Sequence, residues 1–286
     1  MKNTASKKLN PFKITKYTVF VLFIIYSALL LFPFLWILMN SFKTAVDFAA
    51  NVWKIQFSSP QNYLRAFTDF SVNNVNIAMM FGNSIILTAL GVVISLITST
   101  CAAYVVAKYD FLGKNFIFAT AVILIVVPIV GTLPAQVQLL KNLRMFDTMF
   151  GVLFLYSGAF GLNFILLHGY FKNISWAYAE AAFIDGANDF KVLINVIVPI
   201  SKGAFAAVGV LTFLSFWNDF ATPAIFAPSM YTIAVGLDKL STQLIGANEY
   251  PIVFAAIIIA ILPVLIIFII FQKKIIENTI AGGLKG

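Results

Sequence analysis

The sequence predicts an all-α, polytopic membrane protein with six transmembrane helices, and two observations support this fold class. Of its 286 residues, 61% are hydrophobic and only 10% are charged, whereas a typical soluble domain has roughly 25% charged residues. Several stretches also contain the about 20 consecutive apolar residues that a helix needs to cross a bilayer. A lipid environment therefore accounts for this composition better than a globular core does.

The apolar stretches define six spans and divide the chain into three regions. Residues 1–16 are predicted to form one tail, 17–271 a transmembrane domain, and 272–286 a second tail. The first span is longer than the apolar core of a signal peptide, so we expect it to remain in the mature protein. The segment Phe42–Gly82 is expected to be partly helical. The six spans are about Tyr17–Met39, Asn83–Val106, Phe116–Leu139, Phe150–Tyr170, Gly203–Ile225 and Pro251–Phe271.

Basic residues in the connecting segments predict how the spans are oriented. Cytoplasmic segments of membrane proteins carry an excess of Lys and Arg. The two tails and the loops near 108–114 and 172–202 together hold 13 of the 19 basic residues. Both termini and the 172–202 loop are therefore predicted to be cytoplasmic, which agrees with an even number of spans.

The sequence has none of the short motifs that identify common catalytic or nucleotide-binding sites. No Walker A, HExxH, CxxC or GxSxG sequence occurs. His168 is the only histidine, which excludes a metal site built from several imidazoles. The charges lie in short connecting segments rather than in a compact basic domain, so nucleic acid is not an expected partner. We therefore expect no catalytic residue, no metal and no cofactor, and thus no enzyme.

Small residues recur along one face of the second span. Gly91, Ser95, Thr98 and Ala102 follow helical spacing, and small side chains let a neighbouring helix approach closely. This stripe predicts a helix-packing face.

A polar helical hairpin is predicted between the fourth and fifth spans, where Glu180–Pro199 reads EAAFIDGANDFKVLINVIVP. Asp185-Gly186 is a turn dipeptide, and Asp185 is expected to cap the helix that follows it. That second helix has an apolar face formed by Phe190, Leu193, Ile194 and Ile197. From these residues alone, an ordinary interfacial loop remains the alternative.

The same residues resemble the EAA loop of bacterial ABC importer permeases, whose pattern is EAA, three residues, G, nine residues, then I-x-L-P. The spacing agrees throughout, with valine at 196 and 198 as conservative departures. Three further stretches resemble the carbohydrate branch of this family, specifically the smaller permease subunit of maltose-transporter-type systems: Ala102–Lys114, Trp217–Phe220 and the tail Thr279–Gly286. One departure is Ser175, where the family often has a proline before the EAA helix.

The resemblance implies six helices, a bacterial cell membrane location, and a cytoplasmic EAA loop, here 176–200, that docks on an ATPase. It also implies a second homologous permease, an ATPase dimer that binds the ATP, and an extracytoplasmic solute-binding protein. The residues expected to couple to the ATPase are Glu180, Ala181, Ala182, Asp185, Gly186, Ala187 and Pro199. In the C-terminal tail, the residues expected to contact the ATPase are Ala281, Gly282, Gly283, Leu284 and Lys285.

Candidates for the translocation pathway lie near the end of the fifth span: Trp217, Asn218, Asp219 and Phe220. Asp219 is the only acidic residue well inside an apolar span, and such residues are costly in lipid. It is expected either to line the cavity, to support a helix bend, or to serve packing. Two alternatives to a sugar importer remain: a permease for another solute such as glycerol phosphate, and a secondary transporter in which Asp219 carries protons or sodium.

Overall fold

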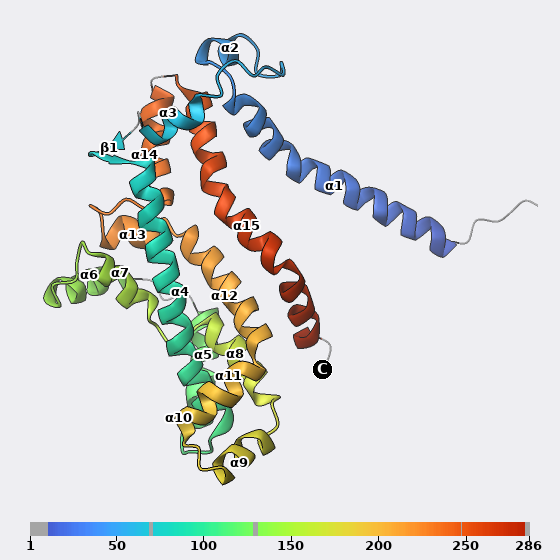
Figure 1. Ribbon diagram of the computed structural model, residues 1–286, viewed down its shortest axis with the longest axis vertical. Helices are drawn as coiled ribbons and strands as arrows, with labels where there is room; N and C mark the ends of the chain where they lie inside the picture. Colours follow the sequence, from blue (N-terminus) through green and yellow to red (C-terminus); the bar gives the residue numbers. More distant parts are fainter. Residues whose placement is uncertain (1–10, 69–70, 128–130, 247, 284–286) are drawn as a thin grey trace, which may run out of the picture. The chain divides into compact units, whose positions relative to one another are not determined.

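The computed structural model describes residues 11–68, 71–127, 131–246 and 248–283, and this part of the chain is predominantly helical (Figure 1). It divides into two compact units. Of the described residues, those within 11–67 and 242–259 belong to the first unit, and those within 68–241 and 260–283 to the second. The all-α prediction is confirmed except for one short strand pair.

The first unit combines α1 (Pro11–Ser41) with α2 (Ala45–Ala50), most of α3 (Asn62–Thr68) and the first residues of α15 (Tyr250–Gly283). The indole of Trp36 packs edge-on against Phe48 and Phe254. Lys43 is fully buried, and its Nζ donates a hydrogen bond to the Asn51 carbonyl at 2.9 Å. The segment after the first span is thus partly helical, as predicted. The buried Lys43 side chain is hydrogen-bonded within this segment.

The strand pair was not predicted from the sequence. It consists of β1 (Ser71–Val72) and β2 (Val75–Asn76), which pair antiparallel. Asn73 and Asn74 join the strands, and both have positive φ, at 50° and 65°. A two-residue turn of this type requires positive φ at both positions, which asparagine tolerates, so the Asn-Asn dipeptide was the available signal.

Helix α4 (Ile77–Lys108) forms the centre of the second unit and packs along α8 (Leu162–Lys172) and α12 (Lys202–Trp217). Of the predicted packing face, Gly91 and Ser95 are buried, and Thr98 and Ala102 are half-buried. Asn163 connects the three helices, because its amide donates to Ser95 Oγ at 3.1 Å and its carbonyl accepts from Thr212 Oγ1 at 3.0 Å. These polar contacts fix the register of the three helices within an otherwise apolar bundle.

Three described helices are long and apolar enough to cross a membrane: Thr15–Ser41, Ile77–Lys108 and Tyr250–Lys273. The other predicted spans are interrupted. The third is divided between α5 (Lys114–Val126) and α6 (Leu133–Asn142), the fourth between α7 (Met149–Tyr156) and α8, and the fifth between α12 and α13 (Ala221–Phe226). The fourth breaks at 157–161, which contains two glycines, and glycine disfavours a helix interior. At membrane depth, such breaks occur where protein or a water-filled cavity surrounds the backbone.

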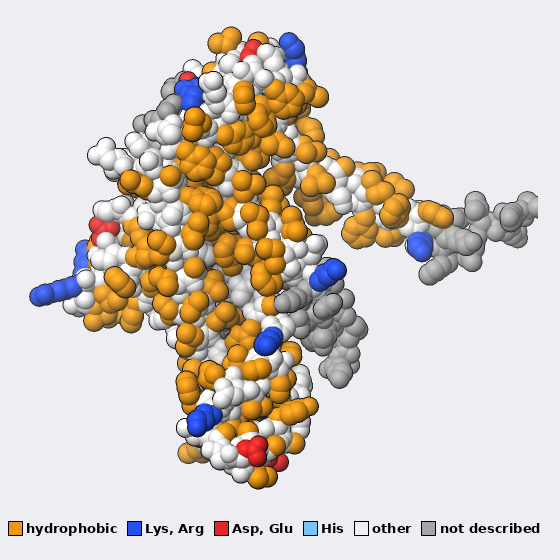
Figure 2. All heavy atoms as spheres, in the orientation of Figure 1, with side chains coloured by type: hydrophobic (Ala, Val, Ile, Leu, Met, Phe, Trp, Pro, Cys, Tyr) orange, Lys and Arg blue, Asp and Glu red, His pale blue; other side chains and the backbone are white. Residues whose placement is uncertain are grey.

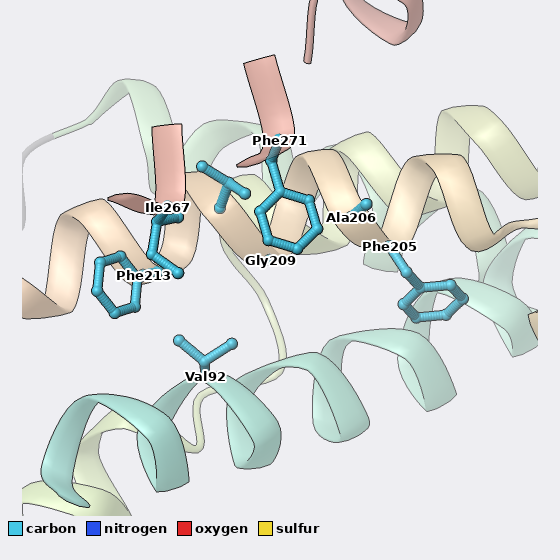
Figure 3. A pocket seen from close by; sticks show the side chains of 8 residues that line it. Val92, Phe205, Ala206, Gly209, Phe213, Ile267 and Phe271 are labelled. Carbon is cyan, nitrogen blue, oxygen red and sulfur yellow. The ribbon is translucent and has the colours of Figure 1, made fainter. Parts of the chain in front are cut away.

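Apolar side chains cover much of the second unit's surface. Figure 2 shows hydrophobic side chains along the visible face of α4 and α12, with charged side chains at the hairpin end of the unit. Between α4, α12 and α15 lies a groove of about 260 Å³ in which every lining side chain is apolar (Figure 3). A surface of this kind suits lipid or another apolar helix rather than water.

Candidate functional site

The predicted hairpin is present and lies beyond the end of α4 in the second unit (Figure 1). Its first arm is α9 (Ala177–Ile184). The second arm consists of α10 (Asp189–Val192), the π-helical turn η1 (Leu193–Ile197) and α11 (Val198–Ile200). The two arms meet at a tight turn over residues 185–188.

Gly186 forms this turn by adopting a left-handed backbone conformation, with φ of 81°. The Ala187 N–H donates to the Ala182 carbonyl at 2.9 Å, and the Gly186 N–H donates to the Phe183 carbonyl at 3.0 Å. This pair of bonds is a Schellman motif, which satisfies the last carbonyls of a helix when the residue after the cap is left-handed. The EAA-loop glycine therefore ends α9 and reverses the chain.

Asp185 does not cap the second arm, so that prediction is wrong. Asp185 is the C-cap residue of α9, whereas the N-cap of α10 is Asn188, whose side chain accepts the Lys191 N–H at 2.9 Å. The reason is geometric, because the Schellman turn extends through Ala187 before α10 can begin. Asp189 in the first turn of α10 adds negative charge where the helix dipole favours it.

Pro199 lies where the second arm approaches the next long helix. Proline has no N–H, and its ring clashes with the carbonyl four residues earlier in an α-helix. The preceding residues Leu193–Ile197 adopt a wider π-helical turn, and the Val198 N–H donates to the Leu193 carbonyl. Beyond Pro199 the chain bends by 83° between Asp189–Ile200 and Lys202–Trp217. The second arm of the hairpin is therefore nearly perpendicular to α12 and directly precedes its first turn.

The inner face of the hairpin is anchored in the core of the second unit. Ala179, Val192 and Ile197 are fully buried and share one cluster with Tyr104 of α4 and Phe171 of α8. The predicted apolar stripe of the second arm is therefore only partly correct. Leu193 and Ile197 point inward, whereas Phe190 and Ile194 are exposed.

The outer face is apolar although it is exposed. Ile184 is 86% exposed, Phe190 68% and Tyr178 55%. Glu180 is also exposed, and within the described part of the chain no ion pair or side-chain hydrogen bond involves it. Of the other coupling candidates, Ala181, Asp185, Gly186 and Pro199 are exposed, whereas Ala182 and Ala187 are half-buried.

A second candidate site is the helix break between α12 and α13. Asp219 accepts a hydrogen bond from the Tyr156 hydroxyl at 2.8 Å and another from the Thr222 N–H at 3.0 Å. Trp217 is buried, and its Nε1 donates to the Ala260 carbonyl at 3.1 Å. Each carboxylate oxygen of Asp219 therefore has a donor, so this residue ties α7 to the start of α13.

Asn218 and Phe220 differ from their neighbours because both are exposed. The Asn218 amide donates to the Leu214 carbonyl at 2.8 Å, and no residue in the described part of the chain donates to its side-chain oxygen. Phe220 is 44% exposed. Of the four pathway candidates, these two present atoms at the surface of the isolated chain.

Tyr156 was missed by sequence reasoning. Its ring stacks on Phe216 with centroids 3.8 Å apart and planes 4° apart. Gly91 of α4 permits this stack, since a Cβ there would lie 2.8 Å from Tyr156 Cδ2. The small-residue stripe identified the receiving surface, but nothing in the sequence indicated which ring occupies it.

The predicted ATPase-contacting tail is only partly described. Ala281, Gly282 and Gly283 continue the backbone of α15, whereas Leu284 and Lys285 lie outside the described residues. Among the residues that the structure describes, no cluster of three or more metal-ligating side chains is present.

Comparison with known proteins gives a consistent result. No protein-family model matches the chain. The chain is 30% identical to the probable ABC transporter permease protein YurM of Bacillus subtilis, covering 94% of this chain and 88% of YurM. It is 28% identical to the diacetylchitobiose uptake system permease protein NgcG of Streptomyces coelicolor, covering 91% of this chain and 86% of NgcG.

A solved structure is also similar over nearly the whole length. It is a bacterial ABC transporter involved in import of the acidic polysaccharide alginate, with a TM-score of 0.77 and 25% identity over 94% of this chain and 99% of that one. The chain lies in the cell membrane as a transport subunit and is not itself an enzyme. On the strength of the YurM match, it belongs to the ABC transporter permease proteins.

Proposed function

We propose that the chain is one of two permease subunits in an ATP-driven, binding-protein-dependent sugar importer, and that it forms half of the translocation pathway. Two of its relatives serve carbohydrates, diacetylchitobiose and alginate. ATP is bound by a partner ATPase dimer, and an extracytoplasmic solute-binding protein delivers the sugar. The chain itself needs no cofactor.

The proposed topology has six membrane crossings with both termini and the hairpin in the cytoplasm. The distribution of Lys and Arg supports this orientation. The interrupted elements supply the remaining crossings beside the three long helices, with α5–α6, α7–α8 and α12–α13 each acting as one broken span.

The observation that carries the proposal is the exposed apolar outer face of an anchored hairpin. Solvent-facing Ile184 and Phe190 are unfavourable in water, whereas large apolar side chains form the energetic centre of protein interfaces. Glu180 and Asp185 lie beside them and supply charge for ion pairs at the rim. We infer that a cleft on the ATPase covers this surface.

The geometry of the hairpin suggests how ATP would drive transport. Closure of the ATPase dimer would displace the hairpin, whose Schellman turn and buried inner face let it move as one body. The 83° bend at Pro199 makes the hairpin a lever on α12. A tilt of α12 would carry its far end, with Asn218 and Phe220, and switch the pathway between inward-open and outward-open. The tail Ala281–Lys285 would contact the same ATPase.

Within the pathway, the four candidates divide into two roles. Asn218 and Phe220 are proposed to meet the sugar, because an amide and an aromatic ring supply hydrogen bonding and stacking. Trp217 and Asp219 are proposed to hold the helix break in place. The apolar groove of Figure 3 is unsuited to a sugar because its lining side chains offer no hydrogen bond.

The charge of the solute is argued from the basic residues of the helices near the break after Trp217. No Lys or Arg lies within α12 beyond its first residue, Lys202, or within α7 and α13. This favours a neutral sugar over glycerol phosphate, although the alginate importer has a similar fold and transports an acidic polysaccharide. A secondary transporter using Asp219 is disfavoured because both of its oxygens already accept hydrogen bonds.

Transport into proteoliposomes tests the proposal. The chain is purified with its partner permease and ATPase subunits and supplied with binding protein loaded from a panel of labelled neutral and acidic oligosaccharides. ATP-dependent uptake of a member of the panel supports the proposal. Uptake driven by a proton or sodium gradient without ATP would instead support the secondary transporter.

A further inference from the structure

The turn between α4 and α5, residues 109–113, contacts both arms of the hairpin. Tyr109 is the C-cap residue of α4, and its backbone is extended, with φ of −103° and ψ of 146°. This extended backbone ends α4. Immediately before it, Lys108 Nζ donates a hydrogen bond to the Ile174 carbonyl, just ahead of the first arm.

The Tyr109 side chain reaches the first residues of both arms. Its ring packs edge-on against Trp176, the residue that precedes α9, with centroids 5.7 Å apart. Its hydroxyl donates to Asp189 Oδ1, at the start of α10, at 2.5 Å. One half-buried side chain therefore connects the two arms opposite the Gly186 turn.

On its other side, Tyr109 is connected to the centre of the bundle. The Tyr104 and Tyr109 hydroxyls are 3.3 Å apart, and the two rings meet edge-on. Since the single Tyr109 hydroxyl proton goes to Asp189, Tyr104 is the donor to Tyr109. Tyr104 is buried and packs against Phe171 of α8. The hydrogen bonds thus run from Tyr104 through Tyr109 to Asp189.

The protonation state supports this direction. Burial, followed by the hydrogen bond with Asp189, raises the pKa of Tyr109 above its usual range. The hydroxyl therefore stays protonated and donates at all physiological pH values. Asp189 has no cationic partner among the described residues, and Asn188 already caps α10, so the carboxylate is free to accept from Tyr109.

We propose that Tyr109 is a positioning residue that locks both arms of the hairpin to α4, so that displacement of the hairpin moves α4 together with α12. This inference rests on the proposed coupling function and extends it, because Pro199 joins the hairpin to α12, whereas Tyr109 adds a hydrogen-bonded link to α4 beside the apolar packing of the inner face. With Tyr109 in place, a displacement of the hairpin moves both α4 and α12 of the second unit.

The native sequence offers a direct test. Cys101 is the only cysteine of the chain and is exposed on α4. Asn195→Cys, at an exposed position of η1 outside the proposed ATPase-binding residues, therefore gives one pair of sites in this chain for nitroxide spin labels. The distance between the labels is measured in nanodisc-reconstituted complex with partner permease and ATPase subunits whose own cysteines have been replaced, with and without ATP plus vanadate. In the parent pair, we expect the same distance distribution in both states, because hairpin and α4 move together.

Tyr109→Phe keeps the ring and removes only the hydroxyl. We expect its distance distribution to shift and broaden when ATP plus vanadate is added, while ATP hydrolysis, measured separately without vanadate, continues. Asp189→Ala breaks the same bond from the other side and should reproduce the shift, which keeps the test valid if one variant assembles poorly. Tyr170→Phe is the matched control, since it removes a long 3.4 Å hydrogen bond to the Ile200 carbonyl nearby and should behave like the parent.

The outcomes separate the inference from the proposed function. If Tyr109→Phe and Asp189→Ala respond to ATP plus vanadate as the parent does, the positioning role is wrong, even if their resting distance differs. If the ATPase subunits do not co-purify with the parent chain, the coupling function fails, and the role of Tyr109 fails with it.

Discussion

The hairpin of residues 177–200 and the break after Trp217 both lie where helices are interrupted, yet their side chains are placed in opposite ways. At the break, Asp219 and Trp217 find hydrogen-bond partners within the chain. At the hairpin, the inner face is buried in the core, whereas the side chains of Ile184 and Phe190 are exposed. The break after Trp217 is therefore complete within one chain, whereas the exposed outer face of the hairpin is the surface that we propose the ATPase covers.

The largest effect is expected at the turn of the hairpin. Gly186→Val should abolish uptake, because a left-handed conformation costs ordinary L-residues roughly 1–2 kcal/mol and is least accessible to β-branched ones. A Cβ at Gly186 would meet no atom within 4 Å, so the effect is conformational rather than steric. The measurement is uptake in proteoliposomes beside the yield of membrane-inserted protein.

Gly186→Asn is the matched control, since asparagine tolerates the left-handed region. It should retain most of the uptake. Equal loss in the two variants would show that backbone conformation at this position is not what coupling requires.

A smaller effect is expected on the outer face of the hairpin. Ile184→Ala should weaken binding of the ATPase roughly tenfold, the loss typical of a strong interface contact, without changing the thermal stability of the isolated chain. Binding is measured with purified ATPase on nanodisc-embedded permease. Ile55→Ala, at a side chain 72% exposed in the other unit, is the control and should bind as the parent does. Unchanged binding of the Ile184 variant would remove this side chain from the interface.

A substitution that disturbs packing around the break should lower the thermal stability of the chain rather than weaken its binding to the ATPase. Gly91→Ala places a Cβ 2.8 Å from Tyr156 and 3.1 Å from Phe216, and overpacking of this kind costs about 1–3 kcal/mol. Gly209→Ala is the control in a neighbouring helix, because its nearest atom would lie 3.6 Å away. The two variants are compared by thermal unfolding in detergent, and equal midpoints would contradict the close Tyr156–Phe216 stack.

The smallest effect is expected at Asp219. Asp219→Asn keeps an acceptor for the Thr222 N–H and should cost about 1 kcal/mol or less of stability, with ATP-driven uptake preserved. Uptake is followed between pH 6 and 8. Complete loss of transport in this variant, together with gradient-driven uptake by the parent, would revive a proton- or sodium-carrying role.

The sequence predicted features that depend on neighbours in the chain. The helical content and the Gly186 turn follow from local composition, and the EAA spacing locates the hairpin. The wrong assignment of the cap to Asp185 arose because the Schellman turn adds residues that a dipeptide signal does not specify. Tyr109 and Tyr156 could not be found, because their partners Asp189 and Asp219 lie 80 and 63 positions away. Exposure of half of the Phe190–Ile197 stripe also requires knowing which surfaces the core already occupies.

Hydrogen exchange across residues 177–197, measured in membrane-embedded permease with and without its ATPase subunits, tests the central claim most directly. If the hairpin is the ATPase contact, amides of α9 and of the Gly186 turn should exchange more slowly when the ATPase is bound. Unchanged exchange there, with protection appearing elsewhere on the chain, would contradict the account.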